Sequence, residues 1–276
     1  MNATLGIPPD PWDDLRAHTQ ARLALGRAGA ALPTGELLRF GLAHAQARDA
    51  VHIPLDADAL ATQLQAQGCR TLRVHSAAPD RATYLLRPDL GRRLCEADAQ
   101  TLRAPGHGAG DPGSAPDLLL VVADGLSSLA VARQAPPLID AIRQQAPTGW
   151  TLGPVVIAQQ ARVALGDEVG ALLGARLVAV LIGERPGLSS PDSLGIYLTW
   201  HPQVGRSDAQ RNCISNVRPE GLPPAAAAAR LWWLCQEAQR LQPTGVQLKD
   251  RSDGAVLGPT ANAGTAGSLA GRDGSG

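Results

Sequence analysis

The feature that most constrains the fold is a series of three nearly uninterrupted apolar runs in the second half of the chain. They cover Asp117 to Ala123, Val155 to Ala158 and Arg176 to Ile182, and segments with helical character separate them. Runs this apolar fit strands that are covered on both faces, as in a parallel sheet. The pattern therefore predicts strands that alternate with helices in an α/β domain.

Helices and a fourth strand complete this expected domain. Helical segments are predicted over Leu126 to Arg133, Pro137 to Gln145 and Val163 to Leu173. Leu194 to Trp200 is the expected fourth strand, and Pro223 to Leu241 is the clearest helix of the chain. The predicted fold class is α/β with a doubly wound, mostly parallel sheet of Rossmann or flavodoxin-like type, preceded by a smaller, mainly helical N-terminal region.

The N-terminal region has other periodicities. Helical patterns recur in four segments, namely 12–25, 34–42 with Thr34 as N-cap, 56–67, and one that ends near Leu102. Between them, 70–75 and 81–86 alternate polar and apolar residues. This alternation predicts two strands joined as a hairpin by the turn-forming residues 76–80.

Composition divides the chain into five segments. Residues 104–116 are dominated by Gly, Pro, Ala and Asp, and residues from 252 onward by Gly, Ala, Ser and Thr. We therefore expect a flexible arm, an N-terminal region, a linker, an α/β domain and a disordered tail, over 1–11, 12–103, 104–116, 117–251 and 252–276.

Charge and cysteine usage exclude several classes of function. Lys and Arg together number 25, as do Asp and Glu, so no net basic field favours nucleic acid. The cysteines at 69, 95, 213 and 235 lack the paired spacing of a zinc site and are too few for a disulfide scaffold. A reduced, cytoplasmic protein is the expectation. Neither a secretory leader nor an apolar run of membrane-spanning length is recognisable, so no membrane association is expected.

Candidate ligand-binding residues follow the apolar runs. In an open parallel sheet the ligand crevice lies outside the carboxyl ends of the strands, where glycine permits close approach and a carboxylate such as Glu184 accepts hydrogen bonds. On these residues alone, one alternative stays open: Asp124 and Ser127 cap the next helix, and Glu184 and Arg185 form a solvated ion pair. The three exits are Asp124-Gly125-Leu126-Ser127, Gln159-Gln160-Ala161-Arg162 leading into Val163, and Gly183-Glu184-Arg185-Pro186-Gly187.

Motifs for other chemistries do not match. No G-x-G-x-x-G follows the first predicted strand, no G-x-x-x-x-G-K-[ST] occurs, and Gly125-Leu126-Ser127-Ser128-Leu129 lacks the final glycine of an esterase elbow. Cys213 with His201 could form a nucleophile and base, although a packed or ligand-lining thiol is the commoner interpretation. Two alternatives stay open: a stand-alone hydrolase or transferase that uses Asp124, Ser127 or Cys213, and a non-catalytic interaction protein.

The adjacent residues Trp232 and Trp233 raise a question about assembly. On a helix they point about 100° apart, so they do not share one narrow buried stripe. Either one of them contacts another chain, or the helix is buried on two sides.

Five short blocks occur in an order typical of one family. In these blocks the chain resembles the small subunit of ethanolamine ammonia-lyase, and the similarity extends from about Asp13 to Lys249. Each block is weak alone, and the longest, Leu-Arg-Pro-Asp-Leu-Gly-Arg-Arg-Leu-Cys, is the most specific. The blocks are Leu38 to Phe40, Tyr84 to Cys95, Asp124 to Ser127, Gly183 to Leu188, and Cys213 to Asn216.

The resemblance implies a cofactor, a partner and a reaction. The α/β domain would enclose part of adenosylcobalamin, in a hetero-oligomer with a large subunit that holds the substrate and the catalytic residues. The reaction would be the radical conversion of ethanolamine to acetaldehyde and ammonia, in which the protein binds and orients while the cofactor performs the difficult chemistry. The family's cobalamin contacts map onto Val163, Glu184 and Cys213. The short N-terminal arm leaves encapsulation in a bacterial microcompartment open.

No metal ligand is expected in this chain. Proteins that bind cobalamin with a histidine on cobalt carry Asp-x-His-x-x-Gly, whereas here Pro105 stands in the Asp position before His107. We therefore predict that no histidine of this chain ligates cobalt.

Overall fold

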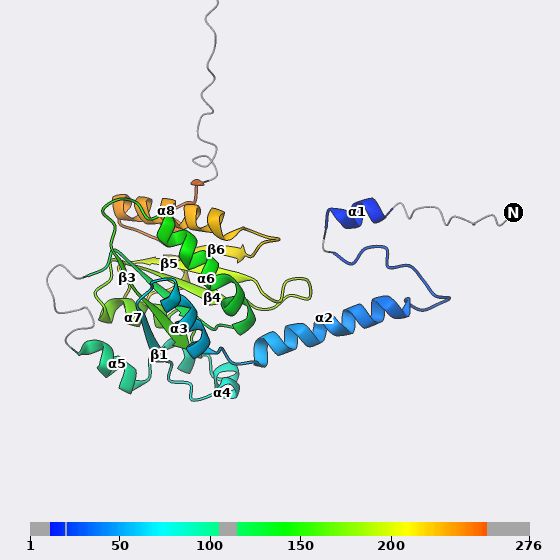
Figure 1. Cartoon of the computed structure of the whole chain (residues 1–276), viewed down its shortest axis with the longest axis horizontal. Coiled ribbons are helices and arrows are strands. Elements are labelled where there is room, and N and C mark those ends of the chain that lie inside the picture. The colour runs from blue at the N-terminus through cyan, green and yellow to red at the C-terminus, as the bar shows by residue number, and fades with distance from the viewer. Residues whose placement is uncertain (1–11, 20, 105–114, 253–276) are drawn as a thin grey trace, which may run out of the picture.

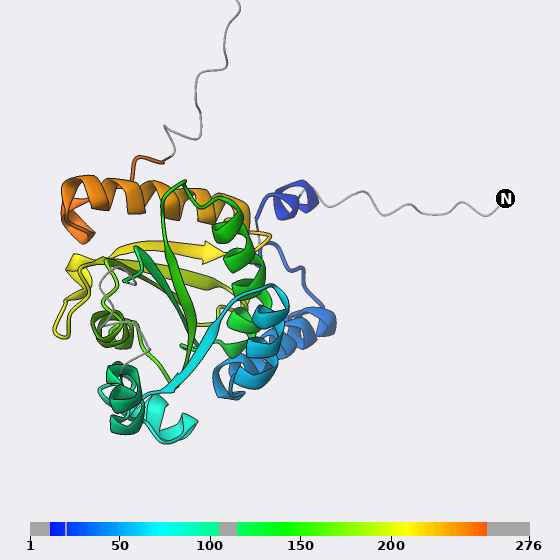
Figure 2. The ribbon, with the colours of Figure 1, turned by 60° about the vertical axis from the view of Figure 1, so that its left-hand side comes forward.

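The computed structural model describes residues 12–19, 21–104 and 115–252, which form a sheet covered by helices on both faces (Figures 1 and 2). The expected arm over 1–11, nearly all of the linker and the tail, and His107 lie outside the described residues.

The sheet has six strands in the order β1-β3-β2-β4-β5-β6. Neighbours among the first four strands run parallel, whereas β5 and β6 extend the sheet antiparallel to their neighbours. The strands are β1 (Thr71–His75), β2 (Leu118–Ala123), β3 (Leu152–Gln159), β4 (Leu177–Gly183), β5 (Leu194–Trp200) and β6 (Asn212–Val217). The helices and 3-10 turns are α1 (Asp13–Ala17), α2 (Thr34–His52), α3 (Ala57–Ala66), α4 (Arg81–Leu86), η1 (Leu90–Arg92), α5 (Glu96–Arg103), α6 (Ser128–Gln144), α7 (Leu165–Leu172), η2 (Asp208–Gln210), α8 (Pro224–Leu241) and η3 (Gly245–Gln247).

Burial on both faces explains why the apolar runs form strands. All of β2 is buried, and its side chains alternate between two core clusters. Leu120 and Val122 pack with α3, α6 and α8, whereas Leu119 and Val121 pack with α5 and α7. The predicted α/β fold with a mostly parallel sheet is thus confirmed, and the Rossmann or flavodoxin-like type stays a prediction.

The expected hairpin over 70–86 is wrong. β1 instead pairs in parallel with β3, at the edge of the main sheet. Residues 81–86 form α4, because the Asp80 carboxylate accepts the Thr83 backbone N–H at 2.8 Å and caps a helix there. The alternating pattern misled because only Tyr84 in this helix is buried.

The two helices expected on either side of Pro136 and Pro137 are one helix, α6. Proline removes a backbone donor and usually ends a helix. Here the buried face continues across both prolines, from Val131 through Leu138 to Ile142, and packing sustains the helix.

Three smaller differences remain. Of the helix expected over 12–25 only the short α1 forms, and Thr34 is the first residue of α2 rather than its N-cap. β6 was not expected, since only Ile214 and Val217 are buried along it and the apolar signal is weak.

The two adjacent tryptophans both belong to the core side of α8. Trp232 is buried, donates from Nε1 to the Ile142 carbonyl at 2.8 Å and meets Trp150 edge-on. Trp233 is half-buried and packs against the same core cluster. Both side chains thus contact the core of this chain itself.

Helix α2 stands away from the sheet (Figure 1). Within the described residues it buries only Ala50, and it exposes Leu37, Leu38, Phe40 and Leu42. A helix that is apolar on several sides is ordinarily covered by other protein. None of the helices in the described ranges combines the length and the apolar character needed to cross a membrane.

Candidate functional site

A pocket of about 230 Å³ opens where β2, β3 and β4 end. The chain leaves β2 toward α6 on one face of the sheet and leaves β3 toward α7 on the other face, and such a divergence creates a crevice between neighbouring strands. The lining residues are Tyr84, Arg92, Gly125, Leu126, Arg162, Val163, Ala164, Ile182, Gly183, Glu184, Arg185, Tyr197 and Asp208.

Two of the three residues implied by the resemblance line this pocket. Val163 comes from the exit of β3 and Glu184 from the exit of β4. Cys213 is not a lining residue. It lies opposite Tyr197 in the β5–β6 pairing, and Tyr197, with which its thiol shares a hydrogen bond, does line the pocket. The structure therefore brings Val163 and Glu184 together and places Cys213 one side chain behind them.

Neighbouring strands orient Glu184. The Ser193 hydroxyl donates a hydrogen bond to its carboxylate, and the Asn216 backbone N–H lies 3.4 Å from both carboxylate oxygens. The alternative in which Glu184 and Arg185 form a solvated ion pair finds no support, since these two described residues make no ion pair with each other.

Two glycines allow the exits of β2 and β4 to touch. The Leu126 backbone N–H donates to the Gly183 carbonyl at 2.9 Å. Gly125 has a φ of 56°, and a Cβ placed on it would lie 2.3 Å from the same carbonyl oxygen. The pocket edge therefore requires glycine at these positions.

One wall of the pocket is aromatic and basic. The Arg162 guanidinium lies over the buried Tyr84 ring, 4.4 Å from its centroid, and Arg92 and Arg185 also line the pocket. Arg162 Nε is buried and lacks a hydrogen-bond partner among the described residues. Charged groups of both signs thus converge here, because Glu184 and Asp208 supply carboxylates in addition to these guanidinium groups.

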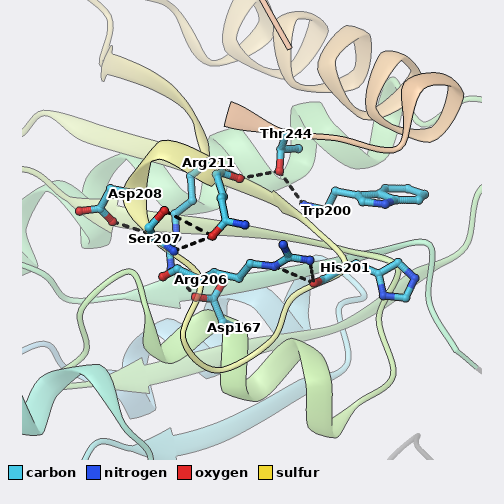
Figure 3. Close-up of polar contacts among 9 residues, drawn as sticks. Asp167, Trp200, His201, Arg206, Ser207, Asp208, Arg211 and Thr244 are labelled. Atoms are coloured by element: carbon cyan, nitrogen blue, oxygen red, sulfur yellow. Dashed lines mark hydrogen bonds and ion pairs between the residues drawn. The ribbon is translucent and has the colours of Figure 1, made fainter. Parts of the chain in front are cut away.

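A buried ion pair connects two sides of the site (Figure 3). Arg211, just before β6, pairs with Asp167 in the first turn of α7, and both side chains are 1% exposed. The same guanidinium reaches the carboxylate of Asp208, a lining residue, at 3.1 Å, and donates to the Arg206 carbonyl at 3.0 Å. The helix that follows Val163 is thereby tied to the loop that carries Asp208.

Asp124 and Ser127 have structural partners. Ser127 caps α6 by accepting the Ala130 backbone N–H, so the capping alternative holds for Ser127 but not for Asp124. The buried Asp124 carboxylate accepts the backbone N–H groups of Gln160 and Ala161 and pairs with Arg81. Burial raises the pKa of Asp124, and Arg81 and these backbone donors oppose that rise.

The geometry does not favour Cys213 and His201 as a nucleophile and base. The His201 backbone N–H donates to the Arg176 carbonyl, so His201 lies where β4 begins. Glu184 and the pocket lie at the opposite end of this strand. Burial raises the pKa of Cys213 and Glu184 raises it further, against the opposing hydrogen bond from Tyr197. A nucleophilic cysteine requires the opposite shift.

This shift predicts slow alkylation of Cys213. Because the thiolate is the reactive form, we expect its iodoacetamide reaction rate to reach half-maximum above pH 8.5, the usual region for a free cysteine. Tyr197→Phe should shift the midpoint higher still, since it removes the hydrogen bond that favours the thiolate. Peptide mapping by mass spectrometry separates Cys213, which is exposed, from the buried Cys69 and Cys235. A midpoint below pH 8 would contradict the assignment.

In the described parts of the chain, no group of three or more His, Cys, Asp or Glu side chains is placed to hold a metal ion. A larger cavity of about 700 Å³ lies between the last turn of α2, the start of α6 and residues 189–192, and it contains none of the three expected contact residues.

Sequence reasoning missed several residues of the site. Tyr84 belonged to the longest family block but was assigned to a strand, and Arg162 was noted only as part of the exit of β3. Tyr197 sits inside an apolar run that gave no sign of a ligand. Nothing in the sequence links Arg211 with Asp167, which is 44 positions away.

Comparisons with known proteins find one family. The family described as "Ethanolamine ammonia-lyase light chain (EutC)" matches residues 9–249. A protein of Ralstonia nicotianae named ethanolamine ammonia-lyase small subunit is 57% identical over 255 residues, which cover 91% of this chain and 92% of that protein. Proteins of the same name from Pseudomonas fluorescens and Xanthomonas campestris pv. campestris are 55% and 57% identical, over 90% and 94% of this chain and 89% and 94% of theirs.

Proposed function

Because this chain belongs to the ethanolamine ammonia-lyase small-subunit family, we propose that it holds part of adenosylcobalamin for the conversion of ethanolamine to acetaldehyde and ammonia, with the substrate site on a large subunit. Val163, Glu184 and Cys213 are the proposed cofactor-binding residues. This chain supplies no catalytic residue and no cobalt ligand in the proposal.

One observation carries the proposal. Val163 and Glu184, from the exits of two different strands, line the same pocket at the ends of the parallel strands. This edge is where open α/β sheets bind their ligands. Cys213 adjoins the pocket through Tyr197, and as a surface residue it can form the outer rim of the site.

The residues of the pocket suit the cofactor. A corrinoid carries amide groups around its ring and a phosphodiester in its nucleotide loop, so it needs both donors and acceptors. Glu184 and Asp208 can accept from amides, and the unpartnered Nε of Arg162 can donate. When bound, adenosylcobalamin supplies the radical chemistry, and this chain binds and orients it and excludes water from the part that it covers.

The size of the pocket supports a shared site. At about 230 Å³ it is smaller than the roughly 300–1,000 Å³ usual for drug-sized ligands, and a corrinoid is larger than those. Most of the cofactor must therefore be covered by another protein. The family name, small subunit, implies a large-subunit partner in a hetero-oligomer.

Helix α2 supports the same partnership. Its last turn is fixed to the pocket end of the sheet, because Arg81 donates to the Val51 carbonyl and pairs with Asp124 at the end of β2. The exposed apolar side chains of α2 therefore extend from the end of the sheet that a partner over the pocket would cover. We propose that the large subunit covers both the pocket and α2.

The proposed location is the cytoplasm, with the assembly free or inside a bacterial microcompartment. This proposal rests on the cysteine spacing.

Reconstitution tests the function. Ethanolamine-dependent acetaldehyde release should require this chain, the large subunit and adenosylcobalamin together. Glu184→Ala should weaken cofactor binding to the assembled complex by about 10- to 150-fold, since a hydrogen bond to a charged group contributes about 1.5–3 kcal/mol. The dissociation constant can be measured by equilibrium dialysis of adenosylcobalamin.

Glu96→Ala is the matched control, because Glu96 is an exposed carboxylate on α5 outside the pocket. It should leave the dissociation constant unchanged. Turnover by the purified chain alone would favour the stand-alone hydrolase or transferase. Full activity of the large subunit without this chain would remove its proposed role.

A further inference from the structure

The loop over 160–163, which delivers Val163 to the pocket, has an unfavourable backbone. Gln160 has a φ of 54°, a left-handed conformation that is uncommon for residues other than glycine. Such conformations persist only where their surroundings impose them. The contacts around this loop therefore decide whether Val163 reaches the pocket.

Asp124 holds the first half of the loop. Its carboxylate accepts the backbone N–H groups of Gln160 and Ala161, both at 2.9 Å, and the side chain is 1% exposed. Arg81, also largely buried, donates to the same carboxylate at 3.2 Å. Asp124 itself is not among the pocket-lining residues, so it acts on the pocket through the loop.

Tyr84 and Gly91 hold the second half. The Tyr84 hydroxyl donates to the Ala161 carbonyl at 3.2 Å, and the Gly91 carbonyl accepts the Arg162 backbone N–H at 2.7 Å. The Tyr84 ring is contacted by the guanidinium groups of Arg81 and Arg162, 4.8 Å and 4.4 Å from its centroid. A Cβ on Gly91 would lie 2.9 Å from this ring.

We propose that Asp124 is a positioning residue for the cofactor pocket, assisted by Tyr84, and that it acts by fixing the loop that presents Arg162 and Val163. This inference rests on the proposed function. It gives two of the sequence blocks, Asp124 to Ser127 and Tyr84 to Cys95, a role in holding the loop in place. This role is distinct from direct contact with the ligand. Four hydrogen bonds, three of them from or to side chains of the Asp124 and Tyr84 blocks, converge on three consecutive residues and hold them in place.

Equilibrium binding to the assembled complex tests the inference. Asp124→Asn replaces one acceptor oxygen by a donor that faces a backbone N–H, and it should raise the dissociation constant for adenosylcobalamin at least tenfold. In the complex without cofactor, the backbone N–H groups of residues 160–163 should exchange with deuterium faster. Tyr84→Phe keeps the ring and loses only the hydroxyl, and a rise of about threefold in the dissociation constant is expected.

Asp58→Asn serves as the control, since Asp58 is an exposed carboxylate paired with Arg73 outside the pocket. Assembled Asp124→Asn complex that binds adenosylcobalamin with the wild-type dissociation constant would overturn the inference, because a purely structural role lowers the amount of folded complex and not its affinity. If this variant does not assemble, Tyr84→Phe decides. Because Tyr84 lines the pocket, weaker binding supports the inference only together with faster exchange of the 160–163 backbone N–H groups in the complex without cofactor, and unchanged exchange overturns it. Absence of cofactor binding by the wild-type complex would instead overturn the proposed function.

Discussion

Arg211→Met is expected to lower the free energy of unfolding by about 3–5 kcal/mol, one of the two largest effects of a single substitution proposed for this chain. Arg211 and Asp167 are both 1% exposed, so removal of the guanidinium leaves a carboxylate buried without its ion-pair partner. Burial already raises the pKa of Asp167, and in the wild type Arg211 opposes that rise. Urea unfolding followed by circular dichroism measures the loss.

The pH dependence of this loss has a defined sign. Without Arg211 the folded pKa of Asp167 stays above its unfolded value, so the folded state favours the protonated carboxyl. The penalty is then small below the unfolded pKa, about 4, and grows as pH rises through the folded pKa. The difference between variant and wild type should therefore shrink as pH is lowered from 8 toward 4.

Two comparisons check the explanation. Combining Arg211→Met with Asp167→Leu should recover much of the stability, because replacing a buried ion pair by apolar side chains is often neutral, and Arg211 Nε already lacks a partner among the described residues. Arg73→Met, which breaks the exposed pair with Asp58, should cost less than about 1 kcal/mol. A double variant as unstable as the sum of the single variants would contradict the ion-pair explanation.

Gly183→Ala is expected to destabilise the chain by about 3 kcal/mol or more. A Cβ at this position would lie 2.1 Å from the Ser127 carbonyl oxygen and 2.7 Å from that of Asp124. Both obstacles are backbone atoms, and the hydrogen bond from the Leu126 N–H to the Gly183 carbonyl keeps them close. The exits of β2 and β4 must therefore separate, which also enlarges and distorts the pocket. Thermal unfolding of the free chain measures the effect.

Gly41→Ala provides the matched control. Gly41 lies in α2 with open space around it, so alanine should stabilise that helix by about 0.5–1 kcal/mol through helix propensity. Equal unfolding temperatures for Gly183→Ala and the wild type would show that the two exits are not in tight contact.

The local sequence pattern was sufficient to predict the strands that are buried on both faces of the sheet. The runs that became β2, β3 and β4 are apolar because both faces of these strands are covered. It failed where a side-chain cap or packing against the core decides. The cap at Asp80 converts an alternating segment into α4, and the continuous buried face of α6 overrides two prolines.

The candidate site likewise has a part that the local sequence pattern predicts and a part that it does not. Parallel strands end at one edge, so residues after β3 and β4 were expected to converge, and Val163 and Glu184 do line one pocket. Cys213 sits on an antiparallel strand that the pattern did not predict, and there the strand-end argument has no force. The hydrogen bond from Tyr84 to Ala161 spans 77 positions, and no local signal in a single sequence predicts a contact of that span.

The projecting α2 also sets a condition on how the chain can be produced. Its exposed leucines and Phe40 form an apolar surface that water disfavours, and crowded copies would bury it against one another. In the proposed assembly the large subunit covers α2, so copies made in excess of it would be prone to aggregation and to capture by chaperones. Balanced synthesis of the two polypeptides would then be a physical requirement of this helix as well as a matter of stoichiometry.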